Sequence, residues 1–172
     1  NYLDEETTDA INSEIDSLLE KKEVDFNYTN RKIFNAYTQS YTIRKVIKEK
    51  RLIDLLSFIL DKKVLPFQTI NFLKGSEQQA HSDWIHMSTF PQGYLIAIWF
   101  ALEDISIEQG PVSYYPSSHL LPYITNADYS NNSTRFLLDG EANQKYEEKV
   151  AGIIRQKKFM QIIHDGGEIK LH

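Results

Sequence analysis

Apolar residues in the first third of the chain recur with the spacing of one helix face. Ile11, Ile15, Leu18 and Leu19 follow this spacing, and the acidic residues near the start of the chain suit the N-terminus of a helix. The pattern predicts a second helix over about residues 31–50. It predicts a third helix over residues 52–60, where apolar residues occur nearly all round and burial is therefore expected.

After Pro66 the pattern changes from helices to strands. The apolar run from Tyr94 to Leu102 predicts a strand buried on both faces, although the same run is compatible with a short helix. The order of helices first and then mainly strands predicts an α+β domain or a helix-decorated β-barrel. One more helix is expected over residues 141–154, and further strands over 67–72, 112–115, 159–163 and 168–171.

Length, charge and cysteine content narrow the class of protein. A chain of 172 residues predicts a single domain, 1–172, with a helical part over 1–62 and a barrel part over 63–172. The net charge of −5 argues against a nucleic-acid partner, and basic clusters at 44–51 and 155–158 are interpreted as solvated helix faces. The absence of cysteine excludes disulfides, cysteine-bound zinc and thiol nucleophiles.

The same composition sets expectations about location. No stretch approaches the roughly 18 consecutive apolar residues of a membrane span, so no membrane partner is expected. The acidic start of the chain does not have the basic and then apolar pattern of a secretory signal, and a cytoplasmic location is expected.

The triplet His81-Ser82-Asp83 is the strongest chemical signal in the sequence. On a strand, side chains two residues apart point the same way, so His81 and Asp83 are expected on one face. An imidazole and a carboxylate placed so can bind two adjacent corners of a metal ion. With a distant histidine they would form the 2-His-1-carboxylate set, which leaves open positions on Fe(II). The alternative reading of the triplet is a partly buried histidine hydrogen-bonded to Asp83.

Three segments in order give this triplet a context. Residues 71–83 end in His-Ser-Asp, residues 99–104 read Trp-Phe-Ala-Leu-Glu-Asp, and residues 110–119 read Gly-Pro-Val-Ser-Tyr-Tyr-Pro-Ser-Ser-His. Together they resemble the phytanoyl-CoA dioxygenase (PhyH-like) family of Fe(II)/2-oxoglutarate-dependent oxygenases. The resemblance is good over residues 64–123 and loose beyond. It implies a mainly β fold with N-terminal helices, namely a double-stranded β-helix (cupin-like jelly roll).

The resemblance also implies roles for individual residues. His81 and Asp83 match the first two iron ligands of the family, and Trp99 matches a position that borders the 2-oxoglutarate pocket. Gln68 falls where the family often places a polar contact to co-substrate or substrate. For Trp99 the alternative is ordinary core packing, since an indole in an apolar strand needs no function. For Gln68 the alternative of a residue without a functional role stays open.

His119 closes a turn that resembles the Pro-Gly-Ser-His turn of the family, but Ser117 stands in place of the glycine. If the turn requires a positive φ, Ser117 carries a strain that glycine avoids. We interpret His119 as a structural residue beside the site rather than as a ligand.

Three positions are open for the third iron ligand. The family ends its metal motif with a short strand and a histidine, and residues 167–172 resemble the start of that strand, with His172 as the candidate ligand. The alternatives are a histidine beyond residue 172, and His164. No arginine follows Arg155, although the family pairs an arginine with the far carboxylate of 2-oxoglutarate. This predicts either a truncated sequence, which the missing barrel strands favour, or a degenerate member.

The expected function is therefore a non-haem Fe(II)- and 2-oxoglutarate-dependent dioxygenase that hydroxylates an aliphatic C–H of a small-molecule substrate with O₂. Asp83 argues against a halogenase, because those relatives replace the carboxylate with a small residue. Two alternatives remain. One is a cupin-like binding protein or degenerate member without catalysis. The other is a metal-dependent hydrolase or isomerase that uses zinc or manganese on a similar barrel.

Overall fold

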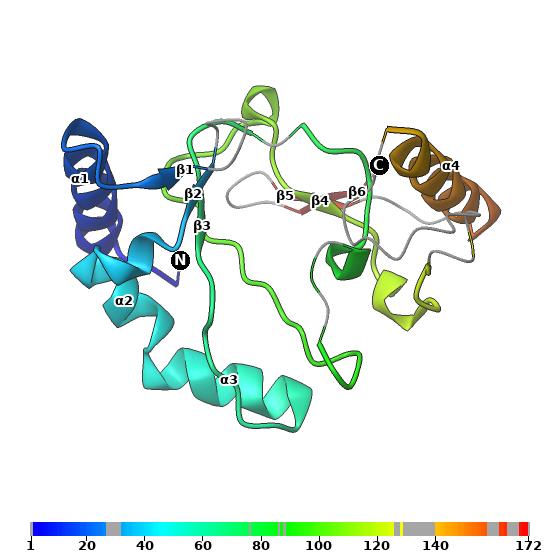
Figure 1. Cartoon of the computed structure of the whole chain (residues 1–172), viewed down its shortest axis with the longest axis horizontal. Helices are drawn as coiled ribbons and strands as arrows, with labels where there is room; N and C mark the ends of the chain where they lie inside the picture. The colour runs from blue at the N-terminus through cyan, green and yellow to red at the C-terminus, as the bar shows by residue number, and fades with distance from the viewer. Residues whose placement is uncertain are drawn as a thin grey trace. The chain divides into compact units, whose positions relative to one another are not determined.

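The chain forms two units, each with its own small sheet and hydrophobic core (Figure 1). The first unit comprises residues 1–76 and 96–104, and the second comprises residues 77–95 and 105–172. The structure is a computed structural model, and it describes residues 2–26, 32–75, 77–85, 87, 89–125, 128, 140–157, 162–164 and 169–171.

Helix α1, Glu5–Glu20, provides one side of the core of the first unit. It begins after Asp4, whose carboxylate accepts a hydrogen bond from the Thr7 backbone N–H at 2.8 Å and so satisfies a donor that the helix leaves unpaired. The predicted apolar face is confirmed. Ile11, Ile15 and Leu18 are buried in the core with residues of α2 and β2, and Leu19 is partly buried against the same core.

The sheet of the first unit is antiparallel, in the order β1-β2-β3. Its strands are β1, Asp25–Phe26, β2, Lys32–Phe34, and β3, Ile70–Phe72. Ile33, at the centre of β2, is completely buried and pairs in register with Asn71. Asn71 lies within the stretch for which a strand over residues 67–72 was predicted, and the observed strand is shorter.

The predicted helix over residues 31–50 is wrong in its first half. Strand β2 and a short 3-10 helix, η1 (Ala36–Thr38), occupy this segment, and α2 spans only Tyr41–Ile47. The backbone turns at Asn35, which adopts a left-handed conformation with φ of 56°. Asparagine tolerates this region better than most residues. Ser40 then caps α2, because its hydroxyl accepts from the Ile43 N–H at 3.0 Å.

Glu14 ties α1 to the start of α2. Its carboxylate accepts hydrogen bonds from the hydroxyls of Ser40 and Thr42 and from the Thr42 backbone N–H at 3.1 Å. Partial burial raises the pKa of Glu14, but these hydrogen bonds to the ionised form outweigh it and hold the pKa below its ordinary value of 4.5.

Helix α3, Lys50–Leu60, occupies the third predicted helix, but the expected burial is wrong. Only Leu52 is buried, whereas Leu55, Phe58 and Ile59 are exposed. The apolar pattern correctly indicated a helix. It did not indicate whether other elements cover the faces of this helix.

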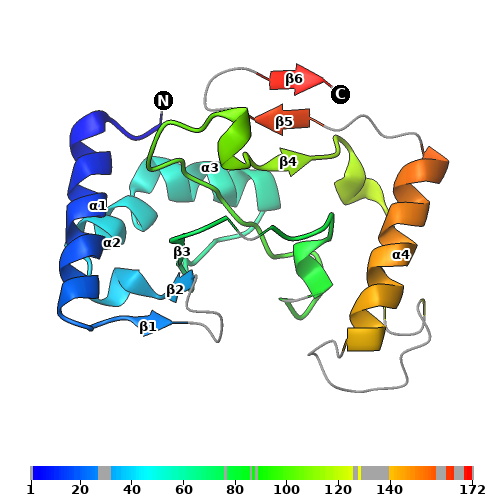
Figure 2. The ribbon, with the colours of Figure 1, turned by 90° about the horizontal axis from the view of Figure 1, so that it is seen from above.

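The second unit carries the sheet β4-β5-β6, which is antiparallel (Figure 2). Its strands are β4, Ser113–Tyr114, β5, Ile162–His164, and β6, Ile169–Leu171. Helix α4, Gly140–Lys157, confirms the predicted helix over residues 141–154. It buries Ala142 and Tyr146, which form a small core with Ile85. The described part of this unit also contains the 3-10 helices η2, Asp83–Ile85, η3, Ile107–Gln109, and η4, Ser118–Leu120.

The predicted mainly β double-stranded β-helix is wrong for the described residues. Among the described residues the α-helices have 16, 7, 11 and 18 residues, whereas each strand has two or three. None of the helices in the described part of the chain has the length and apolarity needed to cross a membrane.

The run from Tyr94 to Leu102 shows why the jelly-roll prediction failed. A strand needs a neighbour whose backbone groups pair with its own. No strand ladder among the described residues includes this run, which is divided between the two units. Phe100 and Leu102 pack against the first core, while Ile98 and Trp99 are each 41% exposed. An apolar run thus indicated partial burial but not a strand.

Replacement of Glu14 by glutamine should destabilise the fold, because glutamine keeps one acceptor oxygen and loses the charge. We expect a loss of about 1–2 kcal/mol of unfolding free energy at pH 7. The pKa of Glu14 is lowered in the folded state, so its contribution is present above pH 4.5 and is lost as the pH falls through the lower, folded value.

Urea denaturation of the wild type and Glu14→Gln between pH 7 and pH 3 tests this. The unfolding free energies of the two proteins should differ at pH 7 and become equal at the acidic end of this range. Asp16→Asn, which removes an exposed carboxylate of the same helix, is the matched control and should stay close to the wild type. An equal effect of both substitutions would contradict the assigned role of Glu14.

Candidate functional site

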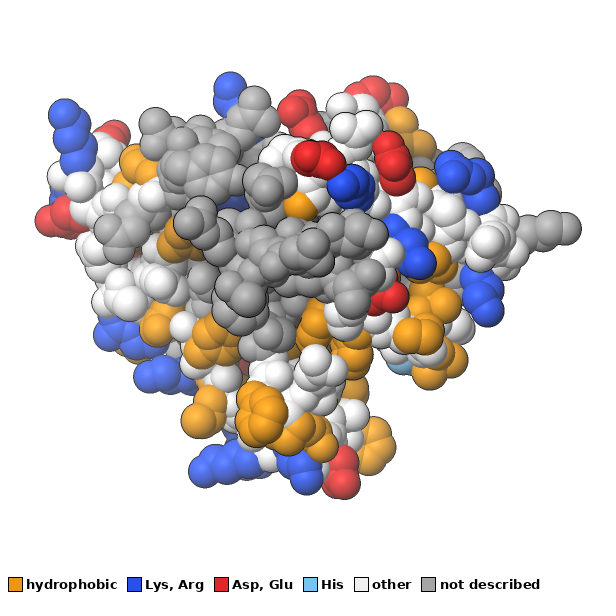
Figure 3. Space-filling view, turned by 45° about the vertical axis from the view of Figure 1, so that its right-hand side comes forward, with side chains coloured by type: hydrophobic (Ala, Val, Ile, Leu, Met, Phe, Trp, Pro, Cys, Tyr) orange, Lys and Arg blue, Asp and Glu red, His pale blue; other side chains and the backbone are white. Residues whose placement is uncertain are grey.

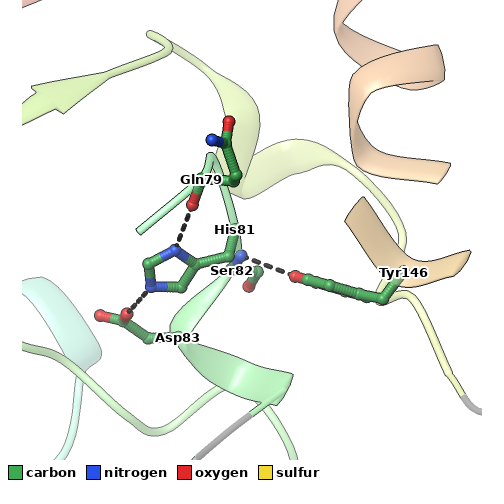
Figure 4. A network of polar contacts seen from close by, with 5 residues as sticks. All are labelled: Gln79, His81, Ser82, Asp83 and Tyr146. Atoms are coloured by element: carbon green, nitrogen blue, oxygen red, sulfur yellow. Dashed lines mark hydrogen bonds and ion pairs between the residues drawn. The ribbon is translucent and has the colours of Figure 1, made fainter. Parts of the chain in front are cut away.

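His81 and Asp83 lie on a segment without regular strand structure, so the expected strand at this point is wrong. Residues 77–82 have no ladder, and the 3-10 helix η2 begins at Asp83. The two side chains nevertheless converge, with His81 Nε2 3.4 Å from Asp83 Oδ1 (Figure 4). The His81 side chain is 24% exposed and that of Asp83 is 55% exposed, so solvent reaches both.

The other ring nitrogen of His81 fixes the proton on the imidazole. Nδ1 lies 2.7 Å from the backbone carbonyl oxygen of Gln79. A carbonyl oxygen only accepts hydrogen bonds, so Nδ1 carries the hydrogen and donates it. In the neutral imidazole Nε2 then has a lone pair directed at a carboxylate oxygen. Two such electron-rich atoms at this separation are stabilised by a cation between them, either a proton on Nε2 or a metal ion.

The donor pair fits a divalent metal ion. Imidazole nitrogen and carboxylate oxygen are two of the ligand types of non-haem Fe(II) sites. Ligand atoms at about 2.1 Å from a metal and at roughly 90–110° to each other lie about 3.0–3.4 Å apart. The distance of 3.4 Å between His81 Nε2 and Asp83 Oδ1 meets this requirement. A histidine ligand usually donates its second N–H to a carbonyl or carboxylate, as His81 does to Gln79.

Helix α4 supports this segment from a distant part of the sequence. The Ser82 backbone N–H donates to the hydroxyl oxygen of Tyr146 at 2.8 Å, so the residue between the two candidate ligands is anchored to the helix (Figure 4). Tyr146 is only 2% exposed, and it packs with Ala142 and Ile85, two residues beyond Asp83. The candidate ligands are therefore held on both sides, by Gln79 before them and by this core after them.

Comparison with known proteins decides the family. The family model described as phytanoyl-CoA dioxygenase (PhyH) matches residues 1–153. The chain belongs to the phytanoyl-CoA dioxygenase family. The family that the sequence motifs suggested is confirmed, and it is one of Fe(II)- and 2-oxoglutarate-dependent oxygenases. Neither the curated proteins nor the solved structures compared with the chain gave a match.

The remaining family positions are distributed as follows. Gln68 is half-buried in the segment before β3, and Trp99 is exposed; both belong to the first unit, whereas His81 and Asp83 belong to the second. His172 lies outside the described residues, and His164 lies in β5. Within the part of the chain that the structure describes, no group of three or more metal-binding side chains comes together. The third ligand therefore stays a prediction.

Beside the candidate ligands, two aromatic rings come together. Trp84, which follows Asp83, lies with its ring centroid 4.9 Å from that of Tyr123. The indole Nε1 of Trp84 is buried and has no hydrogen-bond partner among the described residues. Gly93 has a φ of +91°, and a Cβ atom there would lie 3.0 Å from the Tyr123 hydroxyl, so both the backbone and the close approach require glycine. A buried N–H without an acceptor makes Trp84 a candidate contact for a bound molecule.

Two contacts at this site were missed from the sequence. Gln79 contributes its backbone carbonyl, which accepts from His81 Nδ1. The residue type at position 79 gives no indication of such a backbone contact. Tyr146 had a signal, because Ala142, Tyr146 and Val150 recur at helical spacing in the predicted helix 141–154. A tyrosine on a buried face usually finds a partner for its hydroxyl, so a polar contact of Tyr146 was predictable but its partner was not.

The turn before His119 has the geometry that its motif suggested. Ser117 adopts a left-handed conformation with φ of 65° and ψ of 5°, and its side chain makes no capping hydrogen bond. The condition for strain at this turn is therefore met, because serine occupies a positive φ that glycine adopts more easily. His119 lies in η4 and is exposed. Its structural role stays a prediction.

Replacement of Tyr146 by phenylalanine should weaken metal binding without unfolding the protein. The ring and its packing stay, but the Ser82 N–H loses its acceptor, which costs about 1 kcal/mol of unfolding free energy. Since Ser82 links the two candidate ligands, Mn(II) affinity measured by calorimetry should fall about tenfold or more. Tyr114→Phe, at an exposed position of β4, is the control and should change neither quantity. Unchanged affinity in Tyr146→Phe would contradict the supporting role.

Replacement of Ser117 by glycine should stabilise the protein by about 1 kcal/mol, because glycine adopts a positive φ without strain. The adjacent substitution Ser118→Gly is the control. Ser118 lies inside η4, so glycine there only adds unfolded-state entropy and should destabilise by about 0.5–1 kcal/mol. Thermal unfolding of both variants gives the comparison, and a loss of stability in Ser117→Gly would show that the turn is not strained.

Proposed function

We propose that the protein is an Fe(II)- and 2-oxoglutarate-dependent dioxygenase that hydroxylates an aliphatic C–H of a small-molecule substrate, with His81 and Asp83 as two of the iron ligands. The observation that carries the proposal is the convergence of these side chains, with Nε2 and Oδ1 3.4 Å apart and Nδ1 bonded to the Gln79 carbonyl. Membership of the phytanoyl-CoA dioxygenase family supports it.

The residues of the chain have distinct tasks in this function. The Gln79 carbonyl holds the His81 ring by its Nδ1–H, so Nε2 is presented as a neutral donor. Asp83 supplies a negative charge that partly balances a divalent ion. When bound, Fe(II) and 2-oxoglutarate supply the chemistry that puts one oxygen atom of O₂ into the substrate and the other into succinate, with release of CO₂. Tyr146, through Ser82, keeps both donors in place.

The remaining ligands are proposed from the family resemblance. His172 is the proposed third ligand, with His164 and a histidine beyond residue 172 as the alternatives. Trp99 and Gln68 are the proposed contacts of the 2-oxoglutarate site. A carboxylate, rather than a small residue, at Asp83 favours hydroxylation over halogenation.

Metal binding tests the ligand assignment without relying on turnover. Titration of the metal-free protein with Mn(II) or, without oxygen, with Fe(II) should show one site. His81→Ala and Asp83→Ala should each weaken it more than about a hundredfold, because a lost ligand has a larger effect than a lost supporting contact. The controls are His119→Ala and Asp104→Ala, which change an exposed histidine and an exposed carboxylate and should bind as the wild type does.

Turnover tests the reaction class. With Fe(II), 2-oxoglutarate and O₂, the protein should release succinate, and His81→Ala should not. His172→Ala and His164→Ala identify the third ligand by which of them lowers the metal affinity. Tight metal binding without succinate release would replace the proposed enzyme by a binding protein. If His81→Ala binds the metal as tightly as the wild type does, the assignment of His81 as a ligand is wrong.

A further inference from the structure

Helix α3 exposes a row of large apolar side chains. Leu55, Phe58 and Ile59 recur at i, i+3 and i+4 along one side of the helix, and Phe58 is 85% exposed. Residues of this kind are usually buried in a folded protein, so a helix that presents three of them on one face requires an explanation.

The segment that follows α3 extends this surface. The Val64 backbone N–H donates to the Ser57 hydroxyl at 3.4 Å, which keeps the segment against the end of the helix. Leu65 and Phe67, just beyond, are 75% and 61% exposed. Hydrophobic side chains gather with basic ones at the lower end of the view in Figure 3, the end at which Figure 1 draws α3.

Basic residues stand at both ends of the apolar row. Lys50 and Arg51 begin α3, and Lys62 and Lys63 follow it. Residues 44–63 contain seven basic and three acidic residues, in a chain whose net charge is −5. One of the three acidic side chains, Asp54, is paired with Lys50. The segment is therefore locally cationic in an otherwise anionic protein.

We propose that this surface docks the protein onto an anionic phospholipid membrane. The α3 surface, as we name it, consists of Leu55, Phe58, Ile59, Leu65 and Phe67, with the basic residues Lys50, Arg51, Lys62 and Lys63 around them. Helices that lie in a membrane interface combine these two features: an apolar face enters the boundary of the acyl chains, and Lys and Arg bind anionic headgroups. The long basic side chains can extend outward to the headgroups while their methylene stems stay on the apolar surface.

Charge and shape favour a lipid surface over a protein partner. Two copies of the chain joined through this surface in a symmetric dimer would bring their basic residues together, which is repulsive. Phe58 and Leu65, at 85% and 75% exposure, protrude from the surface rather than line a groove. A lipid interface accepts protruding apolar side chains without a matching pocket. The expectation of no membrane partner concerned a spanning segment, and surface binding requires none.

Co-sedimentation of the full chain with vesicles tests the proposal. The protein should bind vesicles of phosphatidylcholine with phosphatidylserine and bind poorly to phosphatidylcholine alone, and added salt should weaken the binding. Phe58→Ser should lower the affinity about tenfold, through the lost apolar burial. Lys62→Glu and Lys63→Glu should each lower it about fivefold or more.

Two matched controls distinguish binding through the α3 surface from non-specific adsorption to vesicles. Phe90→Ser removes a fully exposed phenylalanine outside the α3 surface, and Lys149→Glu reverses an exposed charge on α4. Both variants should bind vesicles as the wild type does. In hydrogen–deuterium exchange, the backbone amides of residues 50–67 should exchange more slowly in the vesicle-bound protein than in the free protein. Equal losses in Phe58→Ser and Phe90→Ser would overturn the proposal. Failure of the wild type to bind the anionic vesicles would also overturn it. If the wild type instead sediments as a dimer that Phe58→Ser abolishes, the α3 surface is a protein interface and the proposal is likewise overturned.

Discussion

The candidate site depends on one hydrogen bond, from His81 Nδ1–H to the carbonyl of Gln79. Because a carbonyl has no hydrogen to give, this contact determines which nitrogen of the ring carries the proton, and it turns Nε2 toward Asp83. Without it the ring could take the other tautomer or rotate, and an imidazole next to a carboxylate would be an ordinary hydrogen-bonded pair. With it, Nε2 and Oδ1 form two converging electron-rich groups, an arrangement that a cation stabilises.

This short-range geometry relies on long-range support. Residues 77–82 have no strand ladder to hold them, so their position depends on contacts at the two ends of the segment. Tyr146 provides one of these by accepting the Ser82 N–H, and the packing of Ile85 against Ala142 and Tyr146 provides another. The burial of the Tyr146 ring thus serves two purposes, because the same side chain completes a core and positions the residue between two ligands.

The sequence predicted local features better than their assembly. The apolar spacing of Ile11, Ile15, Leu18 and Leu19 correctly predicted α1. The comparison of residue types at Ser117 identified a position where a positive φ would cause strain, and the structure has that φ. The prediction of a jelly roll was wrong, because an apolar run such as Tyr94–Leu102 indicates burial but does not specify a neighbouring strand with which its backbone could pair. The site shows the same division. The His-x-Asp spacing identified two converging side chains, although for a strand that is absent at that point, while Gln79 and Tyr146 depend on tertiary contacts that no local pattern contains.

Two carboxylates show how structural and functional roles differ physically. Glu14 accepts hydrogen bonds from two hydroxyls and a backbone N–H, which satisfy its charge within the fold, and its lowered pKa reflects this. Such a group stabilises helix packing and has little remaining capacity to bind an ion. Asp83 is 55% exposed and directs an oxygen at a nitrogen that is itself a lone-pair donor in the neutral ring. The same functional group is therefore a structural clamp in α1 and a candidate metal ligand in η2, and the donors around it, rather than its residue type, make the difference.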